Sequence, residues 1–389
     1  MSSWIEREAT AVMQTYTRTP ITFIQGSGSW LTSDDGRRYL DFLTGLAVVS
    51  VGHANPRVAA AVAAQMTSLV HVSNLFVTTP MVRLAERLNS LSGMDRTFFT
   101  NCGATANETA IKLARRWGQS RRGPRCHHVI SLAESFHGRT LATLAATGQP
   151  AKQAVFEPLP SGFHQVPAGD IDALAASIDE TTAAVMVETT QGEGGVVPLP
   201  ADYLQAVRAL CDEREVLMVV DDVQAGIGRT GSWFSWQQLG FVPDVATTAK
   251  ALANGLPIGA CLATEDVAAS FERGDHATTF GGGPVVCAAA HAVLDEIEEA
   301  ELLMNTSARS DQLVAGLAAL PGVKSVRGRG LLLAAVLAEP RAGAVAAAAL
   351  DAGLIVNAVR ADAIRFAPPL TVSSDEVELG LEAFRVALG

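Results

Sequence analysis

Short apolar runs alternate with longer amphipathic segments through the middle of the chain. Five of the runs occupy residues 96–100, 128–132, 183–189, 216–222 and 244–249. The central runs are almost wholly apolar, which is typical of strands buried on both faces of a mainly parallel sheet. The segments between the runs, such as 104–118 and 201–215, carry apolar residues at helical spacing. This alternation predicts an α/β architecture.

The two ends of the chain have a different pattern. Residues 20–45 predict a short hairpin with an Asp-Gly turn at residues 35–36. Residues 288–304 predict a long helix, and apolar runs follow in 323–337, 353–359 and 363–370. We therefore expect a large domain flanked by the two parts of a smaller α+β domain. The expected boundaries are an N-terminal segment joining the small domain (1–45), the large domain (46–287) and the C-terminal small domain (288–389).

Size and charge agree with this organisation. The chain has 389 residues, a length that exceeds the usual size of a domain with one hydrophobic core, and 48% of its residues are hydrophobic. Its net charge is −11, and the charged residues are spread along the sequence without a basic run or stripe. Nucleic acid as the main ligand is therefore not expected. A single anionic ligand could still be held by local arginines or helix ends.

The cysteines and the N-terminus indicate the compartment. Five cysteines are scattered without a CxxC pair, which argues for a reducing environment. Residues 1–16 predict an amphipathic helix and not a signal peptide. The longest apolar run, 331–338, is too short to cross a bilayer. We expect a cytoplasmic protein that does not bind membranes.

Chemically distinctive residues follow the predicted strands. The strand at 96–100 leads into "NCGATANE", and the strand at 128–132 leads into "AESFHGRT". The next three strands end at Glu188, Asp221 and Lys250. In an open parallel sheet, ligands bind beyond the carboxyl ends of the strands. These residues are therefore expected to face one crevice.

Lys250 is the most informative member of this set. The chain has only four lysines, and this one ends an apolar strand. A buried, unpaired ammonium group is costly, and burial lowers a lysine pKa from roughly 10.4 toward the nucleophilic free amine. The alternative is a surface lysine whose stem lies along apolar residues.

The other members also have ordinary interpretations. Gly103 and Ala104 could form a simple strand-to-helix turn, and Asp221 could cap a helix. Phe136 could be a core aromatic residue and Arg139 a surface residue. Taken together, a lysine for a Schiff base, an acid for a pyridinium nitrogen, a helix end for a phosphate and a stacking aromatic ring fit pyridoxal 5′-phosphate. A dinucleotide is not favoured, because no GxGxxG is followed by an acid about 20 residues later.

Nine motifs are spread over nearly the whole chain: "YLDFLTGLAVVSVGHANPRV", "HVSNLFVTTP", "FFTNCGATANETAIKLAR", "SFHGRTLATLAATG", "QGEGGVVPLP", "DDVQAGIGRTG", "AKALANGLPIGA", "TTFGGGPVVCAAA" and "RFAPPLT". Together they resemble the class III (ornithine-type) aminotransferases, and among these most of all the acetylornithine aminotransferases. The resemblance implies fold type I of the pyridoxal-phosphate enzymes, with a mainly parallel seven-stranded sheet. It also implies a homodimer with shared active sites.

The resemblance assigns the cofactor-binding residues. Lys250 would bond to the cofactor and move the substrate proton, and Asp221 would pair with the pyridine nitrogen. The remaining roles would be ring packing by Val223 and Phe136, contact with the phenolic oxygen by Gln224, phosphate binding by Gly103 and Ala104, completion of the phosphate site by Thr279 of the second subunit, and a place near the cofactor for Glu188.

The resemblance also assigns substrate contacts. Arg139 would grip a substrate carboxylate, with Thr278 nearby, and Glu193 would mask Arg365 until glutamate needs it. The implied reaction moves the terminal amino group of N-acetylornithine, or a close ω-amino acid, to 2-oxoglutarate by a ping-pong mechanism in arginine biosynthesis. Ornithine, succinylornithine, a diamine or a specialised pathway amine are alternative donors, and a non-catalytic paralogue is a remote alternative.

Several positions depart from the family pattern. They are Cys102 for serine, Thr105 for glutamate, Thr189-Thr190 for a proline and an apolar residue, Asp222 for glutamate, Ala251, Ala253 and Asn254 for glycines, and Gly283 for asparagine. None of these changes removes a chemical role, so they indicate a divergent member of the family.

Overall fold

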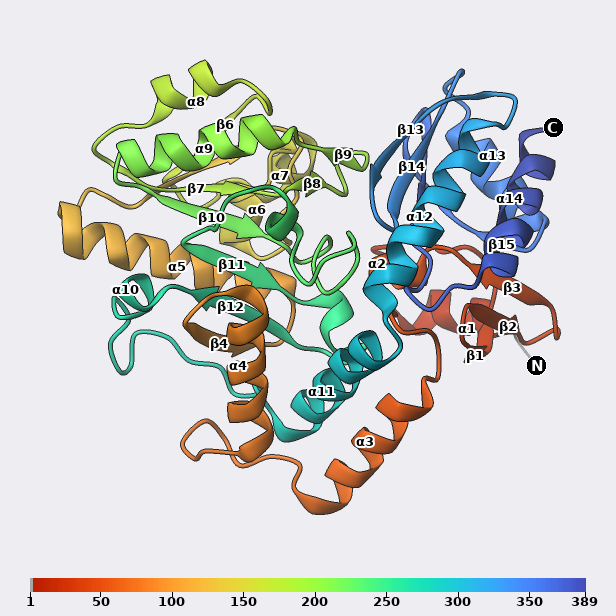
Figure 1. Ribbon diagram of the computed structural model, residues 1–389, viewed down its shortest axis with the longest axis horizontal. Coiled ribbons are helices and arrows are strands. Elements are labelled where there is room, and N and C mark those ends of the chain that lie inside the picture. Colours follow the sequence, from red (N-terminus) through yellow and green to blue (C-terminus); the bar gives the residue numbers. More distant parts are fainter. Residues whose placement is uncertain (1–2) are drawn as a thin grey trace.

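A seven-stranded sheet forms the centre of the computed structural model, which describes residues 3–389 (Figure 1). In spatial order its strands are β4 (Arg96–Thr100), β12 (Gly259–Ala263), β11 (Val245–Thr248), β10 (Leu217–Asp221), β7 (Thr182–Val187), β5 (His128–Leu132) and β6 (Phe163–Val166). β12 runs antiparallel to both its neighbours, and the other neighbouring pairs are parallel. The predicted α/β fold and all five predicted strands are confirmed. β6 and β12 were not predicted.

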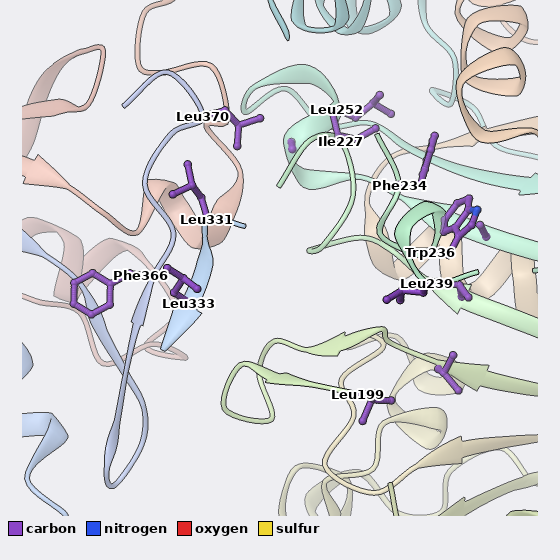
Figure 2. Close-up of a cluster of buried hydrophobic side chains, with 14 of the residues drawn as sticks. Leu199, Ile227, Phe234, Trp236, Leu239, Leu252, Leu331, Leu333, Phe366 and Leu370 are labelled. Atoms are coloured by element: carbon purple, nitrogen blue, oxygen red, sulfur yellow. The ribbon is translucent and has the colours of Figure 1, made fainter. Parts of the chain in front are cut away.

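Burial on both faces explains why the central strands are apolar throughout. Every residue of β7 is buried. Ala184 and Met186 pack into the hydrophobic cluster on one face, and Val185 and Val187 pack into the larger cluster on the other. Figure 2 shows part of the larger cluster, which includes Trp236.

Helices surround the sheet. α5 (Gly103–Arg122) packs along several strands, and α9 (Ala201–Glu213) packs on β10, so both predicted central helices are confirmed. The other elements of this part are α2 (Thr44–Ala47), α3 (Pro56–Ser68), α4 (Thr79–Ser92), α6 (Leu141–Ala146), α7 (Pro150–Gln153), α8 (Ile171–Ser177), α10 (Glu265–Ala268), α11 (Pro284–Glu299), the hairpin β8 (Thr190–Gln191) and β9 (Val197–Pro198), and the 3-10 turns η1 (Ala154–Phe156), η2 (Ser235–Gln238) and η3 (Lys250–Ala253).

Two four-stranded sheets lie beside this body, on the right in Figure 1. One has the order β13 (Val323–Arg329), β14 (Leu332–Leu337), β17 (Ala363–Phe366) and β16 (Asn357–Arg360). The other has the order β1 (Phe23–Ser27), β2 (Trp30–Ser33), β3 (Arg38–Asp41) and β15 (Leu354–Ile355). β15 pairs with β3, with Leu354 opposite Leu40, so the two ends of the chain share one sheet. The division at residues 45 and 287 stays a prediction.

The remaining helices differ in part from the sequence prediction. The single helix expected over 288–304 is wrong, because α11 ends at Glu299 and α12 (Leu302–Ala318) begins a new helix. Glu301 has φ +52°, a left-handed conformation that a continuous helix cannot contain. α13 (Ala342–Asp351) and α14 (Ser374–Leu388) complete the C-terminal part.

The N-terminal segment is confirmed in part. The Asp-Gly turn is present, with Gly36 at φ +84° between β2 and β3. The helix expected over 1–16 is α1 (Trp4–Ala11), which has a Ser3–Glu6 capping box and no buried residue. Residues 1–2 of that prediction lie outside the described residues. From residue 3 to residue 389, no helix has the length and apolar character needed to span a bilayer.

Candidate active site

A cavity of about 380 Å³ lies where the strands of the large sheet end. Most of the predicted site residues line it, namely Gly103, Ala104, Phe136, Arg139, Glu188, Glu193, Asp221, Val223, Gln224 and Lys250. Arg365 reaches the cavity wall through an ion pair with Glu193. Of the predicted residues, Thr278 and Thr279 do not line the cavity. The structure therefore brings most of the predicted residues together around one cavity.

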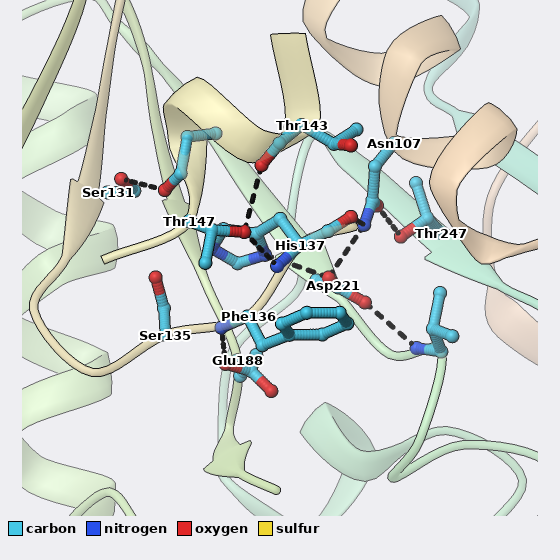
Figure 3. Close-up of polar contacts among 12 residues, drawn as sticks. Asn107, Ser131, Ser135, Phe136, His137, Thr143, Thr147, Glu188, Asp221 and Thr247 are labelled. Carbon is cyan, nitrogen blue, oxygen red and sulfur yellow. Dashed lines mark hydrogen bonds and ion pairs between the residues drawn. The ribbon is translucent and has the colours of Figure 1, made fainter. Parts of the chain in front are cut away.

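The Asp221 carboxylate is fixed by three donors at the end of β10 (Figure 3). Its Oδ2 atom accepts hydrogen bonds from Asn107 Nδ2 at 2.7 Å and His137 Nδ1 at 2.8 Å. Its Oδ1 atom accepts the backbone N–H of Val223 at 3.1 Å. Asn107 is itself held by Thr247, whose hydroxyl donates to the amide oxygen at 2.6 Å. A carboxylate held this firmly can present its remaining lone pairs in one direction.

His137 is a fully buried partner of Asp221. Burial alone would favour the neutral ring, but the hydrogen bond and charge of Asp221 outweigh it and raise the pKa of His137. The protonated ring places a positive charge 2.8 Å from Asp221 Oδ2.

Lys250 begins η3 directly after β11 and faces the cavity. Its φ is +36°, in the left-handed region that a residue with a side chain seldom adopts. Strain of this kind persists where the surrounding structure fixes a functional residue. Burial lowers the pKa of Lys250, although Asp221 and Glu193 favour the charged form. Its Nζ atom makes no hydrogen bond or ion pair with another described residue, so the amine is available to a ligand in the cavity.

Glu188 holds two segments of the cavity wall together. One carboxylate oxygen accepts the N–H of Phe136 at 2.9 Å, and the other accepts the N–H of Gly192 at 3.3 Å. Burial raises the pKa of Glu188 to about 7. The role of this side chain in the described structure is to place Phe136 and the loop after β7.

Glu193 and Arg365 form a partly buried ion pair at the cavity wall. Arg365 Nη1 lies 2.6 Å from Glu193 Oε1 and 3.3 Å from Gln224 Oε1. Arg365 is 1% exposed and Glu193 is 27% exposed. Burial opposes the charge of Glu193, but Arg365 outweighs burial and lowers the pKa of this carboxyl. Arg365 therefore favours the ionised form of Glu193.

The start of α5 forms one end of the cavity. The first N–H groups of an α-helix have no intrahelical acceptor, and Gly103 and Ala104 occupy these positions. Gly103 also makes close packing possible, because a Cβ there would lie 2.6 Å from Val223 Cγ1. Cys102 precedes them at the cavity wall and is exposed. This helix end can bind an anion through backbone donors and the helix dipole.

Arg139 and the two threonines occupy different places. Arg139 lies at the cavity wall, with its guanidinium carbon 5.7 Å from the centre of the Phe136 ring. Thr278 accepts the N–H of Gly281 with its hydroxyl, and Thr279 lines a separate depression. A contribution of Thr279 to the site of a second subunit stays a prediction.

Comparisons with known proteins identify the family. The family described as aminotransferase class-III matches residues 11–388. The acetylornithine aminotransferase of Gloeobacter violaceus is 48% identical, over 95% of this chain and 94% of that protein. The acetylornithine aminotransferase of Methanocaldococcus jannaschii is 42% identical, over 98% and 96%. The crystal structure of N-acetylornithine aminotransferase from Stenotrophomonas maltophilia has a TM-score of 0.85 at 35% identity, over 99% and 98%. The ornithine aminotransferase of Toxoplasma gondii has a TM-score of 0.94 at 29% identity, over 100% and 95%.

The chain belongs to the class-III aminotransferases. Enzymes of this family use pyridoxal 5′-phosphate and act on an amino donor and a keto acid. The cavity of this class-III aminotransferase fits that cofactor on structural grounds. Gln224 Nε2 is a buried donor without a partner among the described residues, and it belongs to a cavity-lining side chain. A cofactor oxygen would satisfy this donor, while the fixed Asp221 carboxylate, the free Lys250 amine and the α5 helix end suit the ring nitrogen, the aldehyde and the phosphate.

Sequence analysis missed the residues that orient Asp221. Asn107, His137 and Thr247 are buried polar residues on three different elements, and each belongs to the hydrogen-bond network in Figure 3. His137 stands between Phe136 and Arg139, so its neighbours were a usable signal. Asn107 and Thr247 had no such signal, because only the packing of α5 on β11 brings them to Asp221.

Proposed function

We propose that the protein moves the terminal amino group of N-acetylornithine, or of a close ω-amino acid, to 2-oxoglutarate, which gives a semialdehyde and glutamate. The main observation in support is the Glu193–Arg365 ion pair, which lies at the wall of the cavity lined by Lys250 and Arg139. The names of the relatives from Gloeobacter and Methanocaldococcus support this substrate.

The charge pattern explains how one cavity accepts two unlike substrates. The first donor carries its reacting amine far from its carboxylate, which we assign to Arg139. While this donor reacts, Glu193 neutralises Arg365 and no second carboxylate is attracted. Glutamate carries its reacting amine next to a carboxylate, which needs Arg365. Rotation of the Glu193 side chain, which is the more exposed partner of the pair, frees the guanidinium for that carboxylate.

Each of the other residues has a defined task. Bound pyridoxal 5′-phosphate supplies an aldehyde that takes up the amino group and a ring that accepts electrons. Lys250 Nζ would move the proton from the carbon that bears the donor amine to the cofactor carbon that takes up the amino group, and its lowered pKa suits it to accept that proton. Asp221 keeps the ring nitrogen protonated. Phe136 and Val223 hold the ring between them, and Gly103 and Ala104 bind its phosphate.

A half-reaction assay tests this function. The cofactor-loaded protein is mixed with one amine at a time, without a keto acid, and the change of its visible absorbance is followed. N-acetylornithine should convert the cofactor, and 2-oxoglutarate should then restore it while glutamate forms. Side-by-side use of acetylated ornithine, free ornithine and succinylornithine identifies the preferred donor. No conversion by any ω-amino acid would refute the proposal.

We also assign a cytoplasmic homodimer in which Thr279 completes the phosphate site of the partner. Large apolar side chains near Thr279 support an interface, since Leu75 is 84% exposed, Phe76 67% and Phe280 66%. Asn74 holds this segment to the Thr279 loop through the carbonyl oxygens of residues 278 and 281.

Mixed dimers provide the test of this arrangement. Lys250→Ala and Thr279→Ala subunits, each inactive or weak alone, are unfolded, mixed and refolded together. If sites are shared, a mixed dimer contains one site with both residues intact and regains activity. Light scattering gives the mass of each species. Activity of a monomer would contradict this assignment.

A further inference from the structure

Three arginines of the sheet formed by β13, β14, β17 and β16 hold the loop that carries Glu193. The loop runs from Thr189 to Leu199 and includes the β8–β9 hairpin, which points toward β13 and β14 in Figure 1. Each contact is a donation to a backbone carbonyl: Arg329 to Thr189 at 3.0 Å and to Leu199 at 2.6 Å, Arg327 to Gly195 at 2.8 and 3.0 Å, and Arg360 to Gly194 at 2.6 Å. The loop is therefore fastened at its base and at its tip.

Arg360 differs from the other two because it also binds a carboxylate outside the loop. Its Nε atom binds the carbonyl oxygen of Gly194, and its Nη2 atom lies 2.9 Å from Glu134 Oε2. Glu134 precedes Phe136 by two residues in the segment after β5. One guanidinium thus joins the backbone beside Glu193 to the side chain of Glu134, two residues before Phe136.

The glycines at the loop tip show how closely these parts fit. A Cβ on Gly194 would lie 2.7 Å from the carbonyl oxygen of Glu134. Gly195 has φ +113°, and a Cβ there would lie 2.5 Å from Arg360 Nε. The tip is enclosed between Glu134 and the arginines, so its backbone position depends on them.

We propose that Arg360 is a positioning residue that sets the choice between the two substrate classes by holding Glu193 against Arg365. This inference rests on the proposed function of the Glu193–Arg365 pair. Arg360 fixes the carbonyl of Gly194, which leaves the Glu193 side chain as the part that moves. Without Arg360 the loop backbone also shifts, and Arg365 is then unmasked when no glutamate is present.

The proposed role depends on the planar guanidinium group, whose N–H groups can bind two separate acceptors. Arg360 binds two acceptors that belong to different segments, and a single ammonium group cannot reproduce that geometry. A general attraction of carboxylates would need only the positive charge. Arg360→Lys keeps the positive charge but removes the bridge between the two segments, so this variant distinguishes the two effects.

The experiment measures the second-order rate constant of the half-reaction with N-acetylornithine and with glutamate. The readout is the rate constant for N-acetylornithine divided by that for glutamate. Arg360→Gln and Arg360→Lys should both lower the ratio by about five-fold or more, since a charge-assisted contact to each segment is lost. Glu193→Gln should lower it too, and the Glu193→Gln/Arg360→Gln double variant should fall no further than Glu193→Gln alone. Arg341→Gln is the matched control, because Arg341, directly before α13, also donates to a backbone carbonyl, that of Leu388 at the end of α14, at 2.9 Å.

The possible results are distinct. An unchanged ratio in Arg360→Gln, a parental ratio in Arg360→Lys, or additive effects with Glu193→Gln would each overturn the role of Arg360. If Glu193→Gln leaves the ratio unchanged, the proposed Glu193–Arg365 function fails first, and the inference about Arg360 fails with it. A fall of the ratio in Arg341→Gln equal to that in Arg360→Gln would show a general loosening of the small sheet and would also refute the role.

Discussion

Replacement of Gly103 by alanine should weaken cofactor binding, because the new methyl group has no space. A Cβ at this position would lie 2.6 Å from Val223 Cγ1 and 3.0 Å from Cγ2. An ordinary carbon–carbon contact is about 3.5–4.0 Å, so the nearest pair is short by about 1 Å. Either Val223 leaves the ring-packing position or the start of α5 moves away from the phosphate site.

The expected size follows from the packing of protein interiors. Overpacking by one methyl group costs about 1–3 kcal/mol. If the cofactor site absorbs the whole of this cost, the dissociation constant rises by about 5- to 150-fold. The assay is a titration of cofactor-free protein with pyridoxal 5′-phosphate, followed by absorbance and protein fluorescence.

Further variants make the test specific. Val223→Ala removes the clashing methyl groups together with their ring packing, so the double variant Gly103→Ala/Val223→Ala is compared with Val223→Ala alone and should recover to nearly the affinity of that variant. Gly343→Ala is the matched control, since α13 has nothing within 4 Å of a Cβ at Gly343 and alanine favours helix. Unchanged cofactor affinity in Gly103→Ala, or no recovery in the double variant, would refute the reasoning.

Three other predictions follow from the site. Lys250→Ala should abolish turnover and prevent covalent attachment of the cofactor on borohydride treatment, which mass spectrometry detects; attachment at another residue would contradict the assignment. Asn107→Ala should leave the Thr247 hydroxyl unpaired, lower stability by about 1–3 kcal/mol and weaken cofactor binding, as measured by thermal unfolding and titration. Burial raises the pKa of Asp222 from 3.8 to about 7. Between these values the folded protein binds more protons than the unfolded chain, so stability should fall by up to about 1.4 kcal/mol per unit as pH rises. Asp222→Asn should lose this part of the slope of melting temperature between about pH 5 and pH 8, and equal slopes would refute it.

The sequence predicted the elements whose pattern is local. β4 and β5 were placed at their observed residues because both are short runs bounded by turns or polar residues. β12 was missed, since "GACLA" is a small-residue run in a glycine-rich stretch. β6 was missed because it lies at the sheet edge and only one of its four residues is buried. The break at Glu301 depends on backbone geometry that the apolar pattern does not encode.

The site was predictable to the extent that strand ends carry it. Lys250 and Asp221 follow apolar runs, and the topology of a parallel sheet brings such ends together. Their support could not be inferred in the same way. Asn107 lies inside a helix, where an asparagine is usually exposed, and Arg360 lies in a separate sheet that meets the Glu193 loop only after folding.

Two departures from the family pattern belong to one hydrogen-bond chain. The hydroxyl of Thr189 donates to Ser235 Oγ at 2.6 Å, and the hydroxyl and N–H of Ser235 both donate to Asp222. All three side chains are buried. Thr189 and Asp222 are thus joined through Ser235, so the two substitutions form one polar network directly behind Asp221. A proline or an apolar residue at position 189 would lack this donor.

Other departures replace a flexible or charged residue with one that fastens the backbone. Asn254 adopts φ +49° as a glycine would, and its amide also accepts the N–H of Val51 at 3.0 Å and donates to the carbonyl of Gly52 at 2.9 Å. The Thr105 hydroxyl accepts the N–H groups of Asn101 at 3.2 Å and Cys102 at 3.1 Å, which fixes the turn into α5. These contacts position the loop after Lys250 and the phosphate end of the cavity without entering either. At Thr105, Thr189, Asp222 and Asn254 the divergence of the sequence therefore lies in the supports of the site.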